Sequence, residues 1–270
     1  MDQQVYQNVM RLVKKVVGID LTHYKDEQMK RRLDSWLIRA HETDWETYFA
    51  RVQKDPDEFT RFRNYLTINV TEFFRDAERW DYLAKNILPE LLRESTKNRT
   101  ASEGLHIWSA GCSVGPEPYS LAMLLDELAP MKKHYLLATD YDRGALQRAK
   151  DGGPYITDDL KNVSPERRRK YFTTSEPPFY VGKNVQRLVT FREQNMLQDP
   201  FENRFDLIVC RNVVIYFTSE TKEMLYKKFC DSIRDGGIFF VGGTEIIPRP
   251  QEYNMRSHGI SFYKKLELEK

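Results

Sequence analysis

The strongest constraint on the fold is a change of sequence pattern about one third of the way along the chain. Up to about residue 95, apolar residues recur at spacings of three and four, and strand signals are nearly absent. From Leu105 onward, short β-rich runs alternate with helical segments. The first pattern is typical of amphipathic helices, and the second predicts a parallel sheet covered by helices. We therefore expect two unlike domains.

The first domain is expected to be all-helical. Its predicted helices lie at about residues 4–17, 25–40, 45–54 and 56–66, with short connections. The predicted domains are a helical domain over residues 1–78, a linker helix over residues 79–96 and an α/β domain over residues 97–270.

One interval interrupts the alternation of strands and helices in the second domain. Residues 155–192 contain Pro177-Pro178, a basic run at residues 167–170 and two short strand candidates, FYVG and RLVTF. These features predict a small inserted antiparallel β subdomain. The closing run GISFYKKLEL alternates in polarity and is expected to be the final edge strand.

Composition excludes several classes of protein. The 270 residues include 42 basic and 40 acidic side chains, a net charge of +2, which does not indicate nucleic-acid binding. The basic run at residues 167–170 is interpreted as a solvated helix face, because no aromatic stacking platform surrounds it. No apolar run has the length of a transmembrane helix, and the N-terminus lacks a signal-peptide core.

The cysteines indicate a reducing compartment. Cys112, Cys210 and Cys230 are odd in number, lack metal-ligand spacing and lie in apolar contexts. We expect reduced, buried thiols, no metal site and a cytoplasmic protein.

A strand, a turn of small residues and a helix start follow one another between Ile107 and Ser120. Gly111 and Gly115 allow positive φ in the turn, and Pro116 suits the first turn of a helix. Such a turn lets a ligand approach the backbone, although a plain strand-to-helix connection is an equal alternative for this feature alone.

Asp140 favours the ligand-binding interpretation. It ends the next predicted strand, 25 residues after Gly115, where a carboxylate can accept both hydroxyls of a ribose. The dinucleotide fingerprint G-x-G-x-x-G is absent, and Glu117 puts negative charge where a pyrophosphate would lie. A ligand with a ribose and a cationic or zwitterionic tail fits better, and S-adenosylmethionine is of that kind.

Four ordered blocks carry a resemblance to a known family. They are TINVTEFFRD (67–76), SAGCSVGPEPYSLAM (109–123), ATDYD (138–142) and CRNVVIYF (210–217). With these blocks the sequence resembles the CheR family of chemotaxis receptor methyltransferases over essentially its whole length. The resemblance implies an all-helical N-terminal domain and a Rossmann-like methyltransferase domain with an inserted β subdomain. It also implies methylation of glutamate side chains of membrane chemoreceptors with S-adenosylmethionine, for sensory adaptation in chemotaxis.

The resemblance further implies roles for individual residues. Arg75, Arg211 and Tyr216 are the predicted catalytic residues. We expect Arg75 to hold the cofactor carboxylate, and Arg211 with the Tyr216 hydroxyl to position the incoming glutamate. The predicted cofactor-binding residues are Asn69, Thr71, Arg75, Glu117, Asp140, Asn195 and Met196 (flanking the adenine), Arg211 and Asn212.

Two departures from the family pattern change these expectations. Val114 and Pro116 stand where the family often has threonine and an acid, so those side-chain contacts are lost. The run VGKNVQRLVTF does not match the edge with which some members hold a receptor C-terminal peptide. Tethering to such a peptide is therefore not expected.

The predicted helix 25–40 carries a polar stripe beside its apolar face. The stripe consists of Lys25, Gln28, Arg32, Ser35 and Arg39. Its basic members are seven residues apart, which suits a helical partner with acids at heptad spacing, and Lys25, Arg32 and Arg39 are the predicted substrate-binding residues. The resemblance implies such a partner, the acidic helical methylation region of chemoreceptors. A solvated helix face is an equally weighted alternative.

The expected chemistry needs no general base. A glutamate side chain has a pKa of about 4.3 and is ionised at neutral pH, so the protein mainly aligns the reactants and excludes water. Two other functions remain open: a carboxyl methyltransferase for another protein or a small acid, and a non-catalytic cofactor-sensing scaffold. Amino-methylating enzymes with Asn-Pro-Pro-Tyr are disfavoured, because residues 211–214 read Arg-Asn-Val-Val.

Overall fold

The protein folds into two compact units. The structure, a computed structural model, describes residues 1–67, 69–98, 100 and 102–267. Unit 1 comprises Met1–Asn69 and Ile215–Glu223, and unit 2 comprises Val70–Val214 and Met224–Lys270. The division falls at Asn69, not near residue 78 as predicted. A short segment far along the chain also belongs to the first unit.

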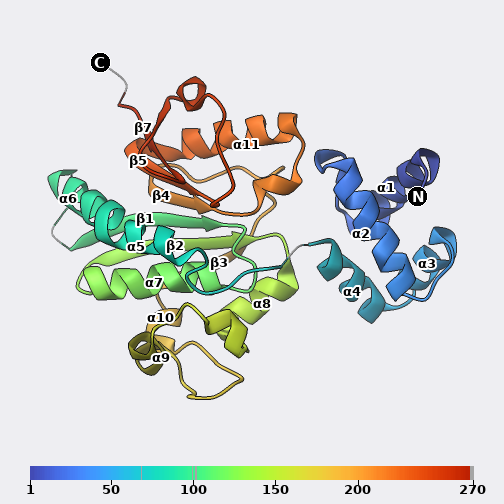
Figure 1. The fold of residues 1–270 in the computed structure, drawn as a ribbon, viewed down its shortest axis with the longest axis horizontal. Coiled ribbons are helices and arrows are strands. Elements are labelled where there is room, and N and C mark those ends of the chain that lie inside the picture. Colours follow the sequence, from blue (N-terminus) through green and yellow to red (C-terminus); the bar gives the residue numbers. More distant parts are fainter. Residues whose placement is uncertain (68, 99, 101, 268–270) are drawn as a thin grey trace. The chain divides into compact units, whose positions relative to one another are not determined.

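Unit 1 is a bundle of four helices, drawn in blue to teal in Figure 1. They are α1 (Gln3–Val17), α2 (Asp26–Arg39), α3 (Trp45–Val52) and α4 (Pro56–Leu66), which confirms the four predicted helices to within two residues at each end. The side chains of Asp2, Asp44 and Asp55 accept backbone N–H groups at the starts of α1, α3 and α4. Local capping signals therefore fix three of these helix starts.

Contacts distant in sequence add the segment Ile215–Glu223 to unit 1. The rings of Tyr24 and Phe217 lie 5.0 Å apart. The amide of Lys25 donates to the carbonyl of Tyr216 at 3.0 Å, and the amide of Thr218 donates to the carbonyl of His23 at 2.9 Å. No local sequence pattern could have indicated this pairing.

Unit 2 is built on a seven-stranded sheet of order β3-β2-β1-β4-β5-β7-β6. The strands are β1 (Glu103–Ala110), β2 (Lys133–Asp140), β3 (Val189–Glu193), β4 (Phe205–Cys210), β5 (Ile233–Val241), β6 (Met255–Ser257) and β7 (Phe262–Lys265). The first five pair in parallel, whereas β7 is antiparallel to both β5 and β6. β6, not β7, is therefore the edge strand. The parallel strands bring their carboxyl ends to one edge of the sheet.

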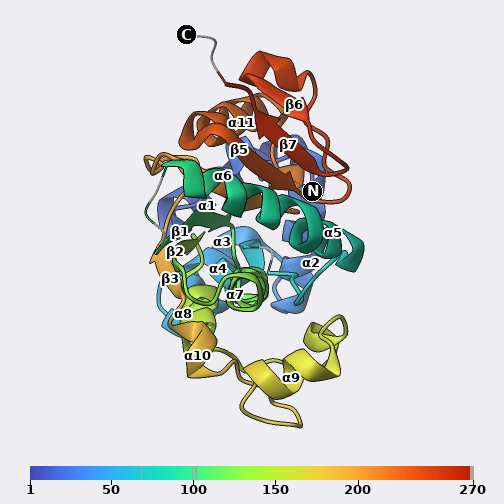
Figure 2. The ribbon, with the colours of Figure 1, turned by 90° about the vertical axis from the view of Figure 1, so that its left-hand side faces the viewer.

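Helices cover both faces of this sheet (Figure 2). One face packs in a single core cluster with α5 (Ala77–Tyr82), α6 (Leu88–Asn98) and α7 (Pro116–Leu128). On the other face, Trp108 of β1 and Phe239 of β5 pack against Phe229 of α11 (Ser219–Ser232). The predicted linker helix thus belongs to the core of unit 2, because Leu83, Ile87 and their apolar neighbours are buried there.

The predicted inserted subdomain differs in detail from the expectation. It contains the short helices α9 (Pro165–Tyr171) and α10 (Lys183–Gln186), joined by the isolated antiparallel bridges Tyr155–Phe179 and Phe172–Val181. Residues 189–193 are instead the parallel edge strand β3 of the main sheet. The bridged residues are buried in the same cluster as α7, so packing against that cluster replaces an extended ladder.

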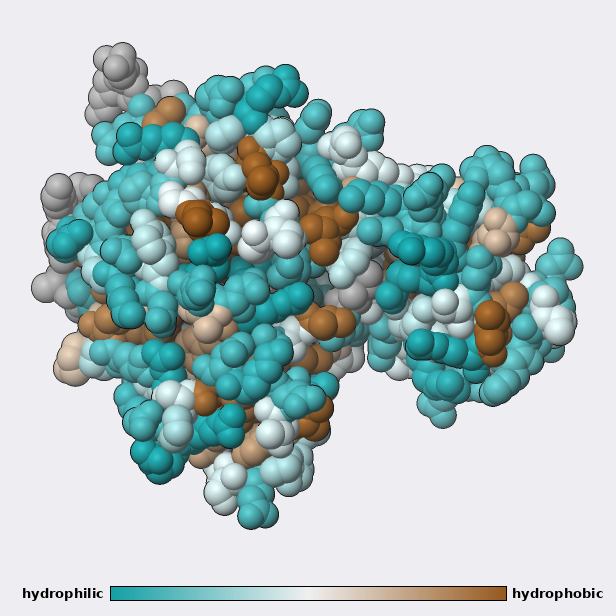
Figure 3. Space-filling model, in the orientation of Figure 1, coloured by the Kyte–Doolittle hydropathy of each residue, from teal (hydrophilic) through white to brown (hydrophobic). Residues whose placement is uncertain are grey.

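Apolar side chains are scattered over the surface shown in Figure 3, among many hydrophilic ones. Val70 and Ile246 of unit 2 and Ile38 of unit 1 are examples of strongly exposed residues. Single exposed residues of this kind are ordinary. Among the described helices, none combines the length and hydrophobicity needed to span a membrane.

Candidate active site

The turn after β1 approaches neighbouring backbone closely. The amides of Gly111 and Cys112 both donate to the carbonyl of Thr139, at 2.8 and 2.9 Å. Gly111 and Gly115 have φ of 79° and 99°, as predicted. A Cβ at residue 111 would lie 2.7 Å from Cγ2 of Val213, so only glycine fits there.

Asp140 lies beside this turn at the carboxyl end of β2. Its Oδ2 accepts the amide of Ser113 at 2.7 Å, and its Oδ1 accepts the amide of Asp142 at 2.9 Å. Burial raises the pKa of Asp140, while hydrogen bonds from the backbone of Asp142, Ser113 and Tyr141 lower it. A carboxylate has about four acceptor positions, more than these donors occupy. The side chain is thus held in place and can still accept a hydroxyl group.

Glu117, in the first turn of α7, is a buried carboxyl group. Its Oε1 accepts the hydroxyl of Ser109 at 2.8 Å, and its Oε2 lies 4.0 Å from Nη1 of Arg211. Burial raises the pKa of Glu117 to about 7, against the opposing effects of Arg211 and Ser109. A ligand cation placed beside it would favour the ionised form. This environment fits the amino group of an amino acid.

Arg211, just after β4, is already engaged within unit 2. Its side chain is 2% exposed, and Nη2 contacts Asp76 Oδ2 at 2.6 Å and the carbonyl of Arg75 at 2.8 Å. The guanidinium also lies 4.8 Å from the ring centroid of Phe240. Burial lowers the pKa of Arg211, and Glu117 and Asp76 raise it. These contacts favour a residue that positions other groups over one that meets the incoming glutamate.

The segment around Arg75 is fixed mainly through its backbone. The carbonyl of Arg75 accepts Nε1 of Trp80 at 2.9 Å in addition to Arg211. Its own guanidinium is partly exposed and donates to the carbonyl of Val70 at 3.0 Å. Thr71 is half-buried in unit 2, whereas Asn69 closes unit 1. The side chain of Arg75 is therefore available to a ligand, while hydrogen bonds from Trp80 and Arg211 hold its main chain in place.

The turn after β3 lies next to Asp140. The amide of Gln194 donates to the carbonyl of Asp140 at 3.0 Å. Asn195 then begins a tight turn, in which its Oδ1 accepts the amide of Leu197 at 3.0 Å and its amide donates to Asp199 Oδ2 at 2.8 Å. The residues predicted to flank an adenine, Asn195 and Met196, are thus placed beside the predicted ribose acceptor.

Two family models cover this chain. One, described as the CheR methyltransferase SAM binding domain, matches residues 69–261, and the other, the CheR methyltransferase all-alpha domain, matches residues 4–67. The chain belongs to the CheR methyltransferase family. The predicted family, fold class and cofactor, S-adenosylmethionine, are confirmed.

Curated relatives agree with this assignment. A chemotaxis protein methyltransferase of Listeria innocua is 38% identical over 94% of this chain and 95% of its own length. Chemotaxis protein methyltransferase 1 of Pseudomonas aeruginosa is 36% identical over 70% of this chain and 71% of its own. A methyltransferase structure from Mesorhizobium loti, at 16% identity and TM-score 0.33, covers 60% of this chain and 54% of its own.

Glu245 of this CheR methyltransferase is not among the predicted site residues, yet it organises the end of β4. The side chain is 6% exposed, and Oε2 accepts the amides of Gly242 at 2.6 Å and Asn212 at 3.0 Å. Asn212 has a φ of 58°. The carboxylate thereby holds the predicted cofactor-binding residue Asn212 in a left-handed conformation. The sequence signal is an acid soon after the Gly242-Gly243 pair, which follows the apolar strand β5.

Tyr216 and the basic stripe of α2 meet in unit 1. They line one surface pocket, together with a further arginine and an aromatic platform: Gln28, Arg31, Arg32, Ser35, Arg39, Tyr65 and Tyr216. Lys25 adjoins this group, since its amide donates to the carbonyl of Tyr216. Because Arg211 belongs to unit 2 and Tyr216 to unit 1, their joint action on a glutamate stays a prediction.

Two arginines of this stripe share one aromatic ring. The guanidinium carbons of Arg32 and Arg39 lie 4.6 and 5.6 Å from the ring centroid of Tyr65. Burial lowers the pKa of Arg32, and Arg39 lowers it further, while Tyr65 and Tyr216 raise it. Among the described residues, none of the ion pairs involves Arg31, Arg32 or Arg39. The positive charge of these arginines is therefore not neutralised by ion pairs with described residues.

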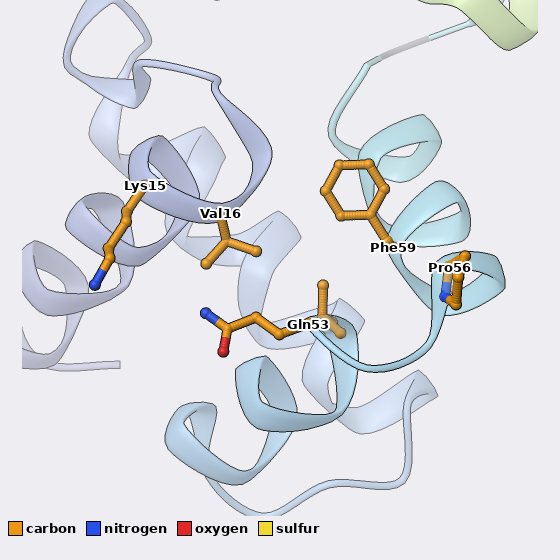
Figure 4. A pocket seen from close by; sticks show the side chains of 6 residues that line it. Lys15, Val16, Gln53, Pro56 and Phe59 are labelled. Atoms are coloured by element: carbon orange, nitrogen blue, oxygen red, sulfur yellow. The ribbon is translucent and has the colours of Figure 1, made fainter.

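Another surface pocket of unit 1 offers no comparable chemistry. It is lined by Lys15, Val16, Val52, Gln53, Pro56 and Phe59. Figure 4 shows the Lys15 side chain directed away from Val16. Within the described part of the chain, no cluster of three or more histidine, cysteine, aspartate or glutamate side chains has the arrangement of a metal site.

Proposed function

We propose that this protein transfers methyl groups from S-adenosylmethionine to glutamate side chains of membrane chemoreceptors. Membership of the CheR family supports the reaction class. The observation that carries the cofactor assignment is a pair of carboxyl groups on adjacent parallel strands: the half-buried Asp140 at the end of β2, and the buried Glu117 in the helix that follows β1. Acidic groups in these positions suit a ribose and an ammonium group, and disfavour a phosphate.

Different residues of unit 2 are proposed to bind different parts of S-adenosylmethionine. When bound, S-adenosylmethionine supplies a methyl group on positively charged sulfur. Asp140 would accept a ribose hydroxyl, and Glu117 would pair with the amino group. The turn at Asn195 and Met196 would contact the adenine. Arg75, with Thr71 beside it, would hold the carboxylate, because its guanidinium is partly exposed and its main chain is fixed.

The acceptor needs orientation more than activation. A glutamate of ordinary pKa is ionised at neutral pH, so no group of the enzyme has to remove a proton. We assign the Tyr216 hydroxyl to the orientation of the incoming carboxylate, because Tyr216 lines the cationic pocket of unit 1. Arg211 and Asn212 would act by holding their neighbours in place.

The partner is proposed to be an acidic helix. Lys25, Arg32 and Arg39 follow one another at seven-residue intervals along the start and length of α2. Helical acids at heptad spacing would meet all three, and the arginines lack ion-pair partners among the described residues. Within residues 181–191, helix α10 takes the place of the extended strand that a peptide tether would need. We therefore propose engagement of the receptor without such a tether.

Transfer of labelled methyl groups tests this function. Purified enzyme and labelled S-adenosylmethionine are incubated with membranes that contain chemoreceptors, and the labelled protein is then treated with mild base. A glutamate methyl ester should release its label, and matched membranes without receptors should take up none. Label that survives base would indicate an amine or thiol acceptor, and label on other proteins would contradict the receptor assignment.

A further inference from the structure

One lysine of α11 reaches the turn that follows β3. The Nζ of Lys228 donates to the carbonyl of Met196 at 2.7 Å and to the carbonyl of Asp199 at 3.0 Å. It also lies 4.0 Å from the ring centroid of Phe201. A single ammonium group thus contacts three residues of the loop between β3 and β4.

The carbonyl groups at the end of this turn need hydrogen-bond donors, and a cation is favourable there. The carbonyl of Asn195 accepts the amides of Gln198 and Asp199 at 3.1 and 2.8 Å, which closes one helical turn. The carbonyls of the following residues have no successor in a longer helix, so they must find other donors. Positive charge is favourable at this end of a helical turn. Lys228 supplies both the donors and the charge.

The ammonium group connects the turn to the rigid core of unit 2. The Phe201 ring beneath it packs against two rings of the core. Its centroid lies 4.7 Å from that of Trp108 in β1 and 5.2 Å from that of Phe229 in α11. Burial lowers the pKa of Lys228, and Asp199 opposes this effect. Lys227, the next residue on the same helix, is exposed and makes none of these contacts.

We propose that Lys228 is a positioning residue for the adenine end of the cofactor site. By engaging the carbonyl of Met196, it fixes the turn while leaving the Met196 side chain and amide for the ligand. The inference rests on the proposed function, since it takes the turn at Asn195 and Met196 as the adenine contact. It assigns Lys228 no contact with the cofactor and no part in methyl transfer.

Calorimetry with two ligands tests the proposal. S-adenosylhomocysteine contains both ends of the cofactor, whereas 5′-methylthioadenosine lacks the amino acid end. Lys228→Met should weaken both by the same factor, roughly tenfold, as expected for losing hydrogen bonds from a charged donor. Glu117→Gln should weaken S-adenosylhomocysteine alone. Lys227→Met, the matched control, should bind both ligands like the wild type.

Further variants separate positioning from a purely structural role. Lys228→Gln keeps a donor without the charge, and its affinities should fall between those of the wild type and Lys228→Met. It also serves if Lys228→Met does not fold. At saturating S-adenosylmethionine, kcat should be unchanged while KM for the cofactor rises. A lower Tm with wild-type affinity for both ligands in the folded variants would overturn the proposal. Failure of the wild-type protein to bind S-adenosylhomocysteine would instead overturn the proposed function.

Discussion

Two groups of charged residues, one in each unit, differ in the partners that they have. In unit 1, Arg32 and Arg39 of α2 lie over the Tyr65 ring without ion-pair partners among the described residues. In unit 2, Arg211 is buried against Asp76 and the Arg75 carbonyl, and Glu245 is buried against two backbone amides. Arg32 and Arg39 are therefore suited to a partner from outside, whereas Arg211 and Glu245 organise the chain itself. Substitutions should separate these two uses.

The largest effect is expected from Arg211→Met. Removing this guanidinium leaves Asp76, Glu117 and the Arg75 carbonyl without their shared cation. We expect the free energy of unfolding to fall by about 2–3 kcal/mol, because the buried Glu117 and the Arg75 carbonyl lose their charged partner. Urea denaturation measures the change, and calorimetry should show weaker binding of S-adenosylhomocysteine.

A matched substitution tests the buried environment of Arg211. Arg79→Met removes an arginine from the nearby helix α5 whose side chain is less buried, and it should change stability by less than about 0.5 kcal/mol. Equal effects of the two substitutions would show that the contacts of Arg211 with Asp76 and Arg75 contribute little.

Charge reversal on α2 should act on the receptor alone. In the double variant Arg32→Glu and Arg39→Glu, KM for the receptor should rise roughly tenfold or more, because attraction to an acidic helix becomes repulsion. The affinity for S-adenosylhomocysteine should not change, and the effect should shrink as salt is added. Arg11→Glu, on the exposed face of α1, is the control. Unchanged receptor kinetics would leave the stripe as a solvated helix face.

The titration of Glu117 predicts a pH dependence of cofactor binding. Its pKa is raised to about 7, so the carboxyl group becomes neutral as the pH falls through that value. Since only the ionised form pairs with an ammonium group, affinity for S-adenosylhomocysteine should fall with decreasing pH, approaching tenfold per unit well below pH 7. Calorimetry between pH 5.5 and 8 measures this. Glu117→Gln should bind weakly at all these pH values, and a steep dependence in that variant would exclude Glu117 as its source.

The smallest effect is expected from Glu245→Gln. The amide oxygen keeps an acceptor for Asn212 and Gly242 but loses the charge that strengthens both hydrogen bonds. We expect a decrease in kcat of roughly threefold, because a neutral acceptor is weaker by a fraction of a kcal/mol. Single-turnover kinetics measures it. Glu245→Ala should have a larger effect, and equal rates in both variants would contradict the role of the charge.

Local patterns predicted the parts of the fold that depend on neighbouring residues. The helices of unit 1, the glycine turn after β1 and the place of Asp140 at the end of β2 follow from periodicity and turn chemistry. The engagement of Arg211 by Asp76 could not be predicted, because these residues are 135 positions apart. The same holds for the return of Ile215–Glu223 to unit 1 and for the hydrogen bonds of Glu245.

Tertiary packing also determines the structure of the segment between residues 155 and 192. The sequence predicts correctly that residues 189–191 are extended. It does not indicate that their partner is β2 of the main sheet, because strand pairing depends on residues distant in sequence. Periodicity reports which face of a segment is apolar, and it contains no information about which element covers that face.

The membership of residues 215–223 in unit 1 has a practical consequence for protein engineering. A fragment that stops at Asn69 would contain α1 to α4 but would expose the Tyr24 ring that Phe217 covers. The helical unit is thus discontinuous in the gene. Exchanging it between homologous enzymes requires that both stretches be transplanted together, and chimeras joined at a single crossover should express poorly.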